Sequence, residues 1–471
     1  MSHRLNRSVL SIDVGTSGVR AAFFDEQGNQ IEDAQALSQR ELAAFAELDP
    51  DALVDEVKRT VDELLAESVT GEIETTAIST FWHSLMGVDA GGRPTTPLLT
   101  WADTRGGRAA KELRAEFDER EIHARTGCRF HPSYWPAKLR WLKTEHPERF
   151  RATRQWLGFG EYLCLKLFGE TTSSVSMASA TGLFDQRSCN WDFDFVAALG
   201  LDLNSLPQLE AKETVVVVGD GAANNIGSGC TTKDQIALMI GTSGAMRVTY
   251  AGEPPATLPP ALWSYRASRE RVVVGGALSD GGGLLQWLVQ ALNVGTDANK
   301  LQQQLAALEP DSHGLTILPF WSGERSTGWS ADARGGIFGL RQQTTNVEII
   351  RAALEAIAYR FALIANALDE IAPGATVIAT GNALRSSPVW LQIIADVLGR
   401  AVMFGGSPEA SIRGAALLAL EAVGKIANLE AVSISVDEVF QPDMRRHARY
   451  REGLARQQEL YDRLFGQNEL S

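Results

Sequence analysis

Cysteine is scarce in this chain of 471 residues, and its four copies lie far apart, at Cys128, Cys164, Cys189 and Cys230. Their spacing matches no metal-ligand motif, so we expect reduced, mostly buried thiols in a cytoplasmic protein. Long apolar runs are also missing, because no window approaches the roughly 18 residues of a membrane span. The N-terminal residues lead into a strand interrupted by Asp13, which is unlike the core of a signal peptide.

Positive charge is the other shortage. Lys and Arg number 44 against 58 Asp and Glu, which gives a net charge of −14. That balance argues against nucleic acid or an anionic membrane as the main partner, although a local basic pocket for a phosphate is compatible with it. The length exceeds what one hydrophobic core supports and predicts two domains.

A short glycine-bounded turn stands out in the first 25 residues. Two apolar runs, 9–14 and 19–24, are joined by Gly15-Thr-Ser-Gly18, which is typical of a β-hairpin. Backbone N–H groups and the hydroxyls of Thr16 and Ser17 make this turn rich in donors, and such a turn favours a phosphate.

The same tetrapeptide occurs again between apolar runs at 241–244. Gly241, Thr242 and Ser243 repeat the first turn, which predicts a duplicated domain whose halves present donors to one polyphosphate. The copies differ just before the turn, where Asp13 corresponds to Met239. A carboxylate there is suited to hold hydrated Mg²⁺. The alternative is that both are ordinary surface hairpins.

Two further segments predict an acceptor site. A buried strand at 75–80 ends just before Trp82 and His83, and ligands of α/β sheets gather beyond such strand ends. Trp101, Asp103 and Arg105 alternate, which predicts one face of an extended segment. An Asp beside an Arg suits vicinal hydroxyls, and a Trp suits the carbons of a sugar. A surface strand end with a simple Asp–Arg pair is the alternative.

A buried strand of four valines at 215–218 breaks sharply at Gly219-Asp220-Gly221 before a possible helix. Asp220 is therefore expected at a strand end facing a helix N-terminus, where a carboxylate is favoured. A carboxylate held in this way suits proton removal from a hydroxyl nucleophile in phosphoryl transfer. A plain helix N-cap is the alternative reading of Asp220.

The second half carries weaker signals for a nucleotide. A strand from Val272 runs into a glycine loop ending at Gly283, a third possible phosphate-facing helix start. Another buried strand ends at Gly381-Asn382, where a flat base can approach the backbone.

With these residues laid out, the chain resembles the FGGY carbohydrate kinases nearly end to end. The most specific stretch is 335–355, which is similar to a family signature, and 12–20, 239–247 and 379–386 resemble two phosphate motifs and an adenosine motif. The segment 133–141 fits another signature only loosely. Within the family, 126–132 and 176–184 most resemble the gluconokinase-like branch, with xylulokinase next.

The resemblance implies two ribonuclease H-like (actin-like ATPase) α/β domains around a central cleft. They would be residues 1–231 for the sugar, with a helical insertion at about 107–169, and residues 232–471 for ATP, with a terminal helix. Asp220 would be the catalytic base, with Trp82, His83 and Asp103 around the sugar and Arg385 in the adenosine motif. ATP and Mg²⁺ are the implied cofactors, and a homodimer is possible.

Three functions follow from this interpretation. The first is an ATP-dependent sugar or sugar-acid kinase, with gluconate as the best acceptor and a pentulose or polyol as the alternative. An actin-like or chaperone-like ATPase would share the hairpins but would not need the Trp82-His83 and Trp101–Asp103 segments. A non-catalytic sugar sensor would not need Asp13 and Asp220.

Overall fold

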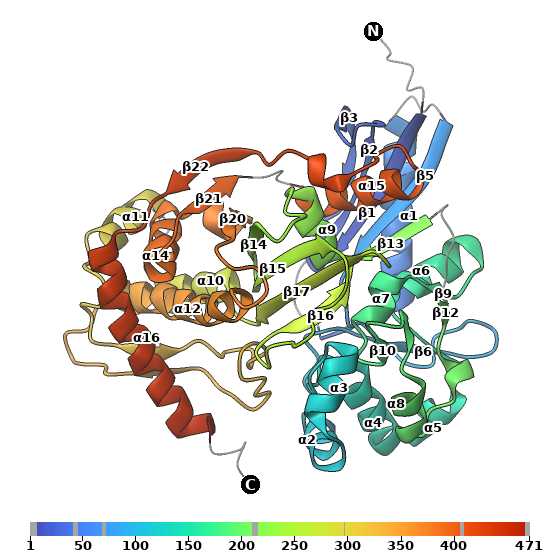
Figure 1. Ribbon diagram of the computed structural model, residues 1–471, viewed down its shortest axis with the longest axis horizontal. Helices are drawn as coiled ribbons and strands as arrows, with labels where there is room; N and C mark the ends of the chain where they lie inside the picture. The colour runs from blue at the N-terminus through green and yellow to red at the C-terminus, as the bar shows by residue number, and fades with distance from the viewer. Residues whose placement is uncertain are drawn as a thin grey trace. The chain divides into compact units, whose positions relative to one another are not determined.

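The computed structural model describes residues 7–40, 46–67, 72–209, 215–295, 297–405 and 409–466. The chain divides into two compact units (Figure 1). The first comprises Met1–Thr232, Thr249–Val274 and Glu409–Ser433, and the second comprises Lys233–Val248, Gly275–Pro408 and Ile434–Ser471. Two late segments therefore complete the first unit. The domain boundary after residue 231 stays a prediction. It would place both of these late segments in the second domain.

The first unit contains a five-stranded sheet in the order β13-β5-β1-β2-β3. These strands are β1 (Arg7–Gly15), β2 (Gly18–Phe24), β3 (Gln30–Leu37), β5 (Glu72–Thr80) and β13 (Val215–Gly219). β1 and β2 form the predicted hairpin, with Gly15 paired to Gly18. β1 also runs parallel to β5, and β5 parallel to β13, so the ends of these strands share one edge of the sheet.

The two faces of β1 differ because side chains alternate along a strand. The Ser11 hydroxyl donates to the carbonyl of Ile412 at 2.7 Å, in α15 (Ala410–Ala422), so this face lies under α15. Asp13, two residues further on, belongs to the same face. Ile12 and Val14 are buried on the other face, and α1 (Pro50–Glu67) packs against β2 and β3.

Two helices of the first unit are in direct backbone contact. These are α15 and α9 (Asp220–Gly227), which also pack against β5 and β13 (Figure 1). A Cβ on Gly414 would come within 1.8 Å of the Ala223 carbonyl oxygen, and a Cβ on Gly227 within 1.8 Å of the Ala410 carbonyl oxygen. Glycine at both positions lets the helices approach this closely.

Helices occupy most of residues 107–168, where a helical insertion is predicted, and small strand pairs also belong to the first unit. These helices are α2 (Gly107–Glu116), α3 (Glu119–Thr126), α4 (Trp135–Glu145), α5 (Pro147–Ala152) and α6 (Phe159–Phe168). They are followed by α7 (Val175–Ser179), α8 (Phe193–Ala198) and η1 (Leu203–Ser205), and η2 (Leu429–Ala431) comes after α15. The strand pairs are β4 (Glu47–Leu48) with β7 (Leu98–Leu99), β6 (Met86–Val88) with β8 (Gln155–Leu157), β9 (Thr172–Ser173) with β12 (Gln208–Leu209), and β10 (Phe184–Asp185) with β11 (Asn190–Trp191).

A second large sheet has the order β16-β17-β15-β14-β20-β21-β22 among the described residues. Its strands are β14 (Gln235–Ile240), β15 (Gly244–Ala251), β16 (Trp263–Arg266), β17 (Arg271–Leu278), β20 (Thr376–Thr380), β21 (Val402–Gly405) and β22 (Val436–Phe440). β14 pairs antiparallel with β15 and parallel with β20. The order β17-β15-β14-β20-β21 thus repeats β3-β2-β1-β5-β13, as the two matching turns predict.

The remaining elements belong to the second unit. They are α10 (Gly282–Ala291), α11 (Ala298–Ala306), β18 (Thr316–Leu318), β19 (Gly336–Phe338), α12 (Asn346–Leu368), α13 (Asn382–Arg385), α14 (Pro388–Leu398) and α16 (Met444–Phe465). α12 begins with a capping box between Thr345 and Glu348. The predicted terminal helix is α16. None of the described helices is both long enough and apolar enough to cross a membrane.

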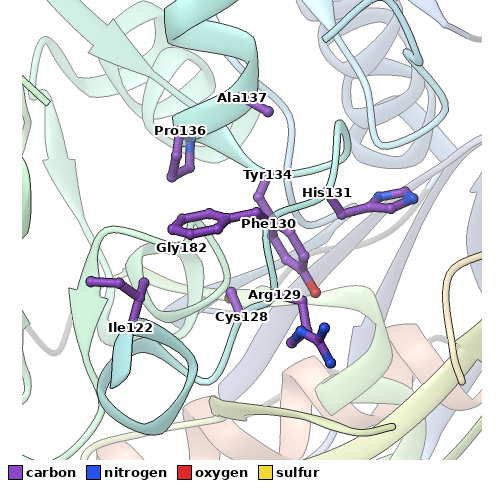
Figure 2. Close-up of a pocket in the computed structure, with 9 residues that line it drawn as sticks. All are labelled: Ile122, Cys128, Arg129, Phe130, His131, Tyr134, Pro136, Ala137 and Gly182. Atoms are coloured by element: carbon purple, nitrogen blue, oxygen red, sulfur yellow. The ribbon is translucent and has the colours of Figure 1, made fainter. Parts of the chain in front are cut away.

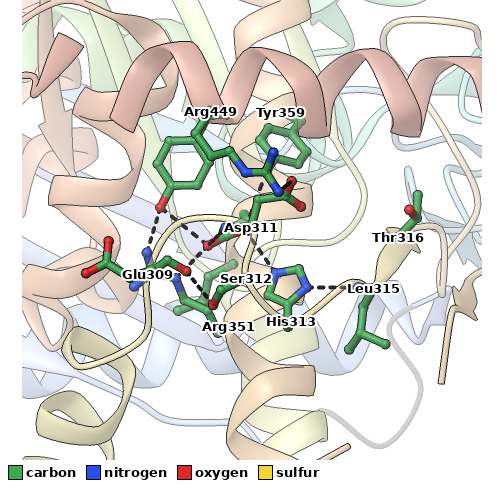
Figure 3. A network of polar contacts seen from close by, with 12 residues as sticks. Glu309, Asp311, Ser312, His313, Leu315, Thr316, Arg351, Tyr359 and Arg449 are labelled. Carbon is green, nitrogen blue, oxygen red and sulfur yellow. Dashed lines mark hydrogen bonds and ion pairs between the residues drawn. The ribbon is translucent and has the colours of Figure 1, made fainter. Parts of the chain in front are cut away.

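A buried ion-pair network connects α12, α16 and the loop before β18 (Figure 3). Glu355 accepts from Arg351 Nε at 2.6 Å and bonds His313 Nε2 at 3.0 Å. Asp311 accepts from Arg456 and lies 3.3 Å from Arg449 NH2. Burial alone would raise the pKa of Glu355, but His313 and Arg351 outweigh it and lower that pKa.

The ligand atoms of Asp311, His313 and Glu355 lie within 4.8 Å of one another, as in a metal site. Three arginines already neutralise the two carboxylates, however, so we interpret the cluster as an ion-pair network that holds α16 on α12.

Glu355→Gln should lower the free energy of unfolding of the second unit by about 3–5 kcal/mol, because it leaves the buried Arg351 charge without its partner. Denaturant unfolding followed by circular dichroism measures this. Glu459→Gln, at an exposed i,i+4 pair on α16, is the control and should change the value by less than about 0.5 kcal/mol. Similar small effects in both variants would contradict the role given to Glu355.

Candidate active site

Asp13 is buried in the first unit among other charged groups. On neighbouring strands it pairs with Arg20 in β2 and Ser79 in β5. Burial raises the pKa of Asp13 to about 6; Ser79 and Arg20 oppose this rise, and the carboxylates of Asp220 and Glu409 add to it.

Arg20 lies between two of these carboxylates. Its NH1 is 3.7 Å from Asp13 Oδ2 and its Nε is 2.9 Å from Glu409 Oε2. Asp13, with the carboxylates of Glu409 and Asp220 acting on it, makes this a negative site of hard oxygen ligands, and such a site suits a divalent cation such as Mg²⁺.

Asp220 is the first residue of α9, directly after β13. The N-cap position belongs to Gly219, so the alternative that Asp220 is itself the N-cap is wrong. One oxygen of Asp220, Oδ1, accepts from the backbone N–H of Gly221 at 2.7 Å, and the side chain is only partly buried. The helix N-terminus favours its ionised form, which is the form a general base needs.

Trp82 lies against the junction that carries Asp220. A Cβ on Gly219 would be 1.9 Å from the Cε2 atom of the indole, so only glycine leaves room for the ring. The indole Nε1 donates to the Ser176 carbonyl at 3.0 Å, and the Ser176 hydroxyl accepts from the Gly219 N–H at 3.2 Å. Trp82 is 5% exposed and packs against Gly219, so it supports the point where β13 ends and α9 begins with Asp220.

His83 has an unusual backbone for a residue other than glycine, with φ of 66°. Its Nδ1 lies 2.7 Å from the Ala180 carbonyl oxygen, which can only accept, so Nδ1 carries the proton and Nε2 is the acceptor of the neutral ring. Tyr134 and Tyr265 meet the imidazole edge-on at centroid distances of 5.0 and 5.5 Å. These contacts fix the ring orientation.

The segment carrying Trp101 and Asp103 differs from expectation. Residues 101–105 form turns after β7 instead of an extended strand, because the Asp103 N–H bonds back to the Thr100 carbonyl at 3.2 Å. Asp103 nevertheless pairs with Arg105 through both oxygens, at 3.0 and 2.9 Å. Only 2% of Asp103 is exposed, whereas 42% of the Arg105 side chain is exposed, so the pair reaches from the interior to the surface and both interpretations of it stay predictions.

In the second unit, three predicted nucleotide-site segments come together. The 241–244 turn accepts backbone hydrogen bonds from the glycine loop: Gly282 N–H to Gly241 O at 2.8 Å, and Gly283 N–H to Thr242 O at 3.0 Å. Gly381, with φ of 107°, leaves no room for a Cβ beside Ile240 O, at 2.3 Å. Gly283 stays a predicted site residue, but its N–H is used by the turn.

Two adenosine-motif residues lie on α13. Asn382 begins this short helix, and Arg385 ends it. The Arg385 guanidinium lies over the Phe404 ring at 5.1 Å and 3.9 Å from Asp437 Oδ2, so it contacts β21 and β22. Their roles toward a base stay predictions.

Figure 2 shows a small hollow in the first unit, between α3 and the segment leading into α4. Its lining is mostly apolar, as with Phe130 and Pro136, and its arginine, Arg129, pairs with Glu119 at 2.7 Å. None of the predicted sugar residues lines it. We therefore interpret the hollow as a gap in packing and not as the acceptor site.

Sequence reasoning did not single out several residues of this region. Arg20 lies inside the first phosphate motif, and its charge two residues after Gly18 was an available signal. Glu409 comes from a distant part of the chain and gave no local signal, and Ser176 lies in the segment 176–184 that carries the branch resemblance but was not itself a candidate. Lys138, in the loosely matching segment 133–141, is buried.

Solved structures with this architecture are sugar kinases. The gluconate kinase of Lactobacillus acidophilus matches with a TM-score of 0.87 at 24% identity, over 97% of this chain and 98% of that one. The ligand-bound xylulose kinase of the same organism matches with a TM-score of 0.88, also at 24% identity and the same coverage. The fold is thus the two-domain, ribonuclease H-like ATPase fold of sugar kinases, and that prediction is confirmed.

The chain belongs to the FGGY family of carbohydrate kinases. Residues 8–239 match the family's N-terminal domain, and residues 236–423 match its C-terminal domain. The gluconokinase of Bacillus subtilis (strain 168) is 30% identical over 468 residues, which cover 92% of this chain and 91% of that protein. The chain is therefore an ATP-dependent phosphotransferase with an alcohol group as acceptor, and the family prediction is confirmed.

Gly219→Ala should lower the turnover of phosphoryl transfer by about 100-fold or more, because the new Cβ would displace Trp82 or the Asp220 junction by an ångström or more. The φ of Gly219 is −69°, so the backbone itself accepts alanine. Steady-state kinetics measures the effect.

Gly107→Ala is the matched control, since nothing lies within 4 Å of a Cβ built there. Replacing Trp82 by leucine in the Gly219→Ala background should restore part of the turnover by removing the clash. Full activity of Gly219→Ala alone would show that the junction tolerates a shift and would contradict this account.

Proposed function

We propose that this kinase transfers the γ-phosphate of ATP to a hydroxyl of a sugar acid, with gluconate as the preferred acceptor. The similarity to gluconokinases over nearly the whole chain supports the choice of gluconate. A pentulose such as xylulose, or a polyol, is the second choice. The observation that carries the reaction type is the geometry of Asp220, a carboxylate held at a strand–helix junction beside buried Asp13.

In this proposal Asp220 accepts the proton of the attacking hydroxyl, since the helix N-terminus keeps it ionised until the proton moves. Trp82 holds the junction from behind. His83, Trp101 and Asp103 form the acceptor side, with Asp103 oriented by its two hydrogen bonds from Arg105. Proton removal at a fixed carboxylate is useful only when the hydroxyl is oriented, so these roles depend on one another.

Asp13, with Glu409 and Asp220 nearby, would hold Mg²⁺, since hard oxygen ligands in a negative site fit this ion. When bound, the ion would supply charge neutralisation for the phosphates. Thr16 and Ser17 in the first unit, and Gly241, Thr242 and Ser243 in the second, would donate to phosphate oxygens. Gly381, Asn382 and Arg385, with the Gly283 loop, would form the nucleoside side. A cytoplasmic location and a homodimer also stay proposals.

The first experiment is an ADP-release assay with gluconate, xylulose, glycerol and glucose as acceptors. Gluconate should give a kcat/KM about 100-fold or more above the others, because a site that pairs an acceptor's polar groups strongly rejects analogues that leave its own groups unpaired. Phosphorus NMR of the product identifies the esterified hydroxyl. Preference for xylulose would move the chain to the second choice, and ADP release without any acceptor would favour a plain ATPase.

Asp220→Asn should lower turnover by about 10²–10⁴ and leave the affinity for ATP nearly unchanged, which is the scale of losing a general base. Turnover is measured with the preferred acceptor, and nucleotide affinity by calorimetry. Asp297→Asn is the control, because it changes another aspartate at a helix start where asparagine also caps. Near-normal turnover of Asp220→Asn would remove Asp220 from the mechanism.

A further inference from the structure

Lys138 lies in α4 with 1% of its surface exposed, which places it among the buried charged residues of the described chain. Burying an ammonium is costly unless its N–H groups are satisfied. Its Nζ donates to the His83 carbonyl at 2.9 Å and to the Ser133 carbonyl. The two carbonyls that accept from its Nζ therefore indicate its role.

The first carbonyl belongs to the strained residue of the acceptor side. A residue other than glycine keeps a positive φ only where its surroundings over-determine it. At His83 three bonds do so: Lys138 to its carbonyl, its own Nδ1 to Ala180 O at 2.7 Å, and Trp135 Nε1 to the next carbonyl, Ser84 O, at 2.8 Å. Trp135 and Lys138 are one turn apart, so a single face of α4 holds two successive carbonyls.

The second carbonyl connects Lys138 to the turn that carries Asp103. The Ser133 hydroxyl donates to the Trp101 carbonyl at 2.9 Å. The negative charge of Asp103 also acts on Lys138 and raises its pKa, against the lowering by burial. Lys138 therefore joins two loops directly and the third through Ser133. These loops are the ones that carry His83, Ser133, and Trp101 with Asp103.

We propose that Lys138 is a positioning residue of the acceptor site, which fixes the backbones of His83 and Ser133 and thereby the groups that orient the acceptor hydroxyls. This inference rests on the proposed function, because it takes His83, Trp101 and Asp103 as the acceptor side. Lys138 acts through these backbones and does not contact the acceptor. Its removal therefore loosens one side of the site and leaves the phosphate turns unchanged.

The kinetic test compares Lys138→Met, which keeps the length of the side chain and removes its donors, with Lys143→Met on an exposed part of α4. Lys138→Met should raise the KM for the acceptor about tenfold or more and change the KM for ATP less than about twofold. Lys143→Met should match the wild type. Equal rises in both KM values, or loss of active protein with unchanged KM values, would overturn the proposal.

The same kinetics separate positioning from contact. A positioning role weakens gluconate and the poorer neutral acceptors by similar factors, because all of them meet the same displaced loops. A selective loss for gluconate would mean that Lys138 binds its carboxylate directly, and that outcome also overturns the proposal.

Hydrogen exchange by mass spectrometry gives a readout that needs no substrate. Peptides covering 81–84 and 131–134 should exchange faster in Lys138→Met than in Lys143→Met, while peptides of the 241–244 turn should not change. If the wild type phosphorylates no acceptor, the proposed function fails, yet this difference still tests whether Lys138 holds the loops. Unchanged exchange in both loop peptides would overturn the positioning role itself.

Stability against pH gives an independent signature. Burial lowers the pKa of Lys138 to about 7, and the Asp103 charge opposes this effect. The other titratable and charged groups facing this region are Arg105, His83, His131 and Tyr134. The unfolded chain keeps the lysine proton up to about pH 10.4, so the wild type should gain stability relative to Lys138→Met between pH 7 and 10. A flat difference over that range would contradict a pKa of Lys138 lowered by burial, while the kinetics and the hydrogen exchange test the positioning role itself.

Discussion

The close contact between α9 and α15 is the constraint on which the first unit depends. Gly227 and Gly414 let the two backbones touch, and this contact fixes the two helices against each other. Asp220 is the first residue of α9, and Glu409 immediately precedes α15. Both carboxylates come near buried Asp13 and raise its pKa, and Arg20 opposes this effect through its ion pairs with Asp13 and Glu409. The same packing that covers the sheet thus brings three carboxylates together.

Much of this could be predicted from the sequence because the signals are local. A turn flanked by β-branched runs specifies its hairpin whatever lies around it, so both Gly-Thr-Ser-Gly turns were found. The valine strand before Gly219-Asp220 and the strand before Trp82-His83 likewise end where expected. A duplicated hairpin also carries topological information, because a repeat of the turn implied a repeat of the strand order.

The remainder depends on contacts between residues far apart in the chain. Nothing near Trp82 shows that its ring needs a glycine at 219, and nothing near Lys138 shows that the carbonyls of His83 and Ser133 surround its ammonium. The alternation of Trp101, Asp103 and Arg105 favoured a strand, but the backbone bond from Asp103 to Thr100 made turns instead. The alternation of residue types does not predict this hydrogen bond, because the bond depends on how the segment packs after β7.

The interleaved first unit has a consequence for how the protein is made. Its sheet is nearly complete once residue 219 has been synthesised, but the helix that covers Asp13 comes from residues 410–422. A ribosome therefore extends the chain by almost two hundred residues before that helix emerges, and domains otherwise tend to fold as they appear. Until then the face of the sheet that carries Asp13 lacks the helix that packs on it, so the first unit completes its packing only late in translation.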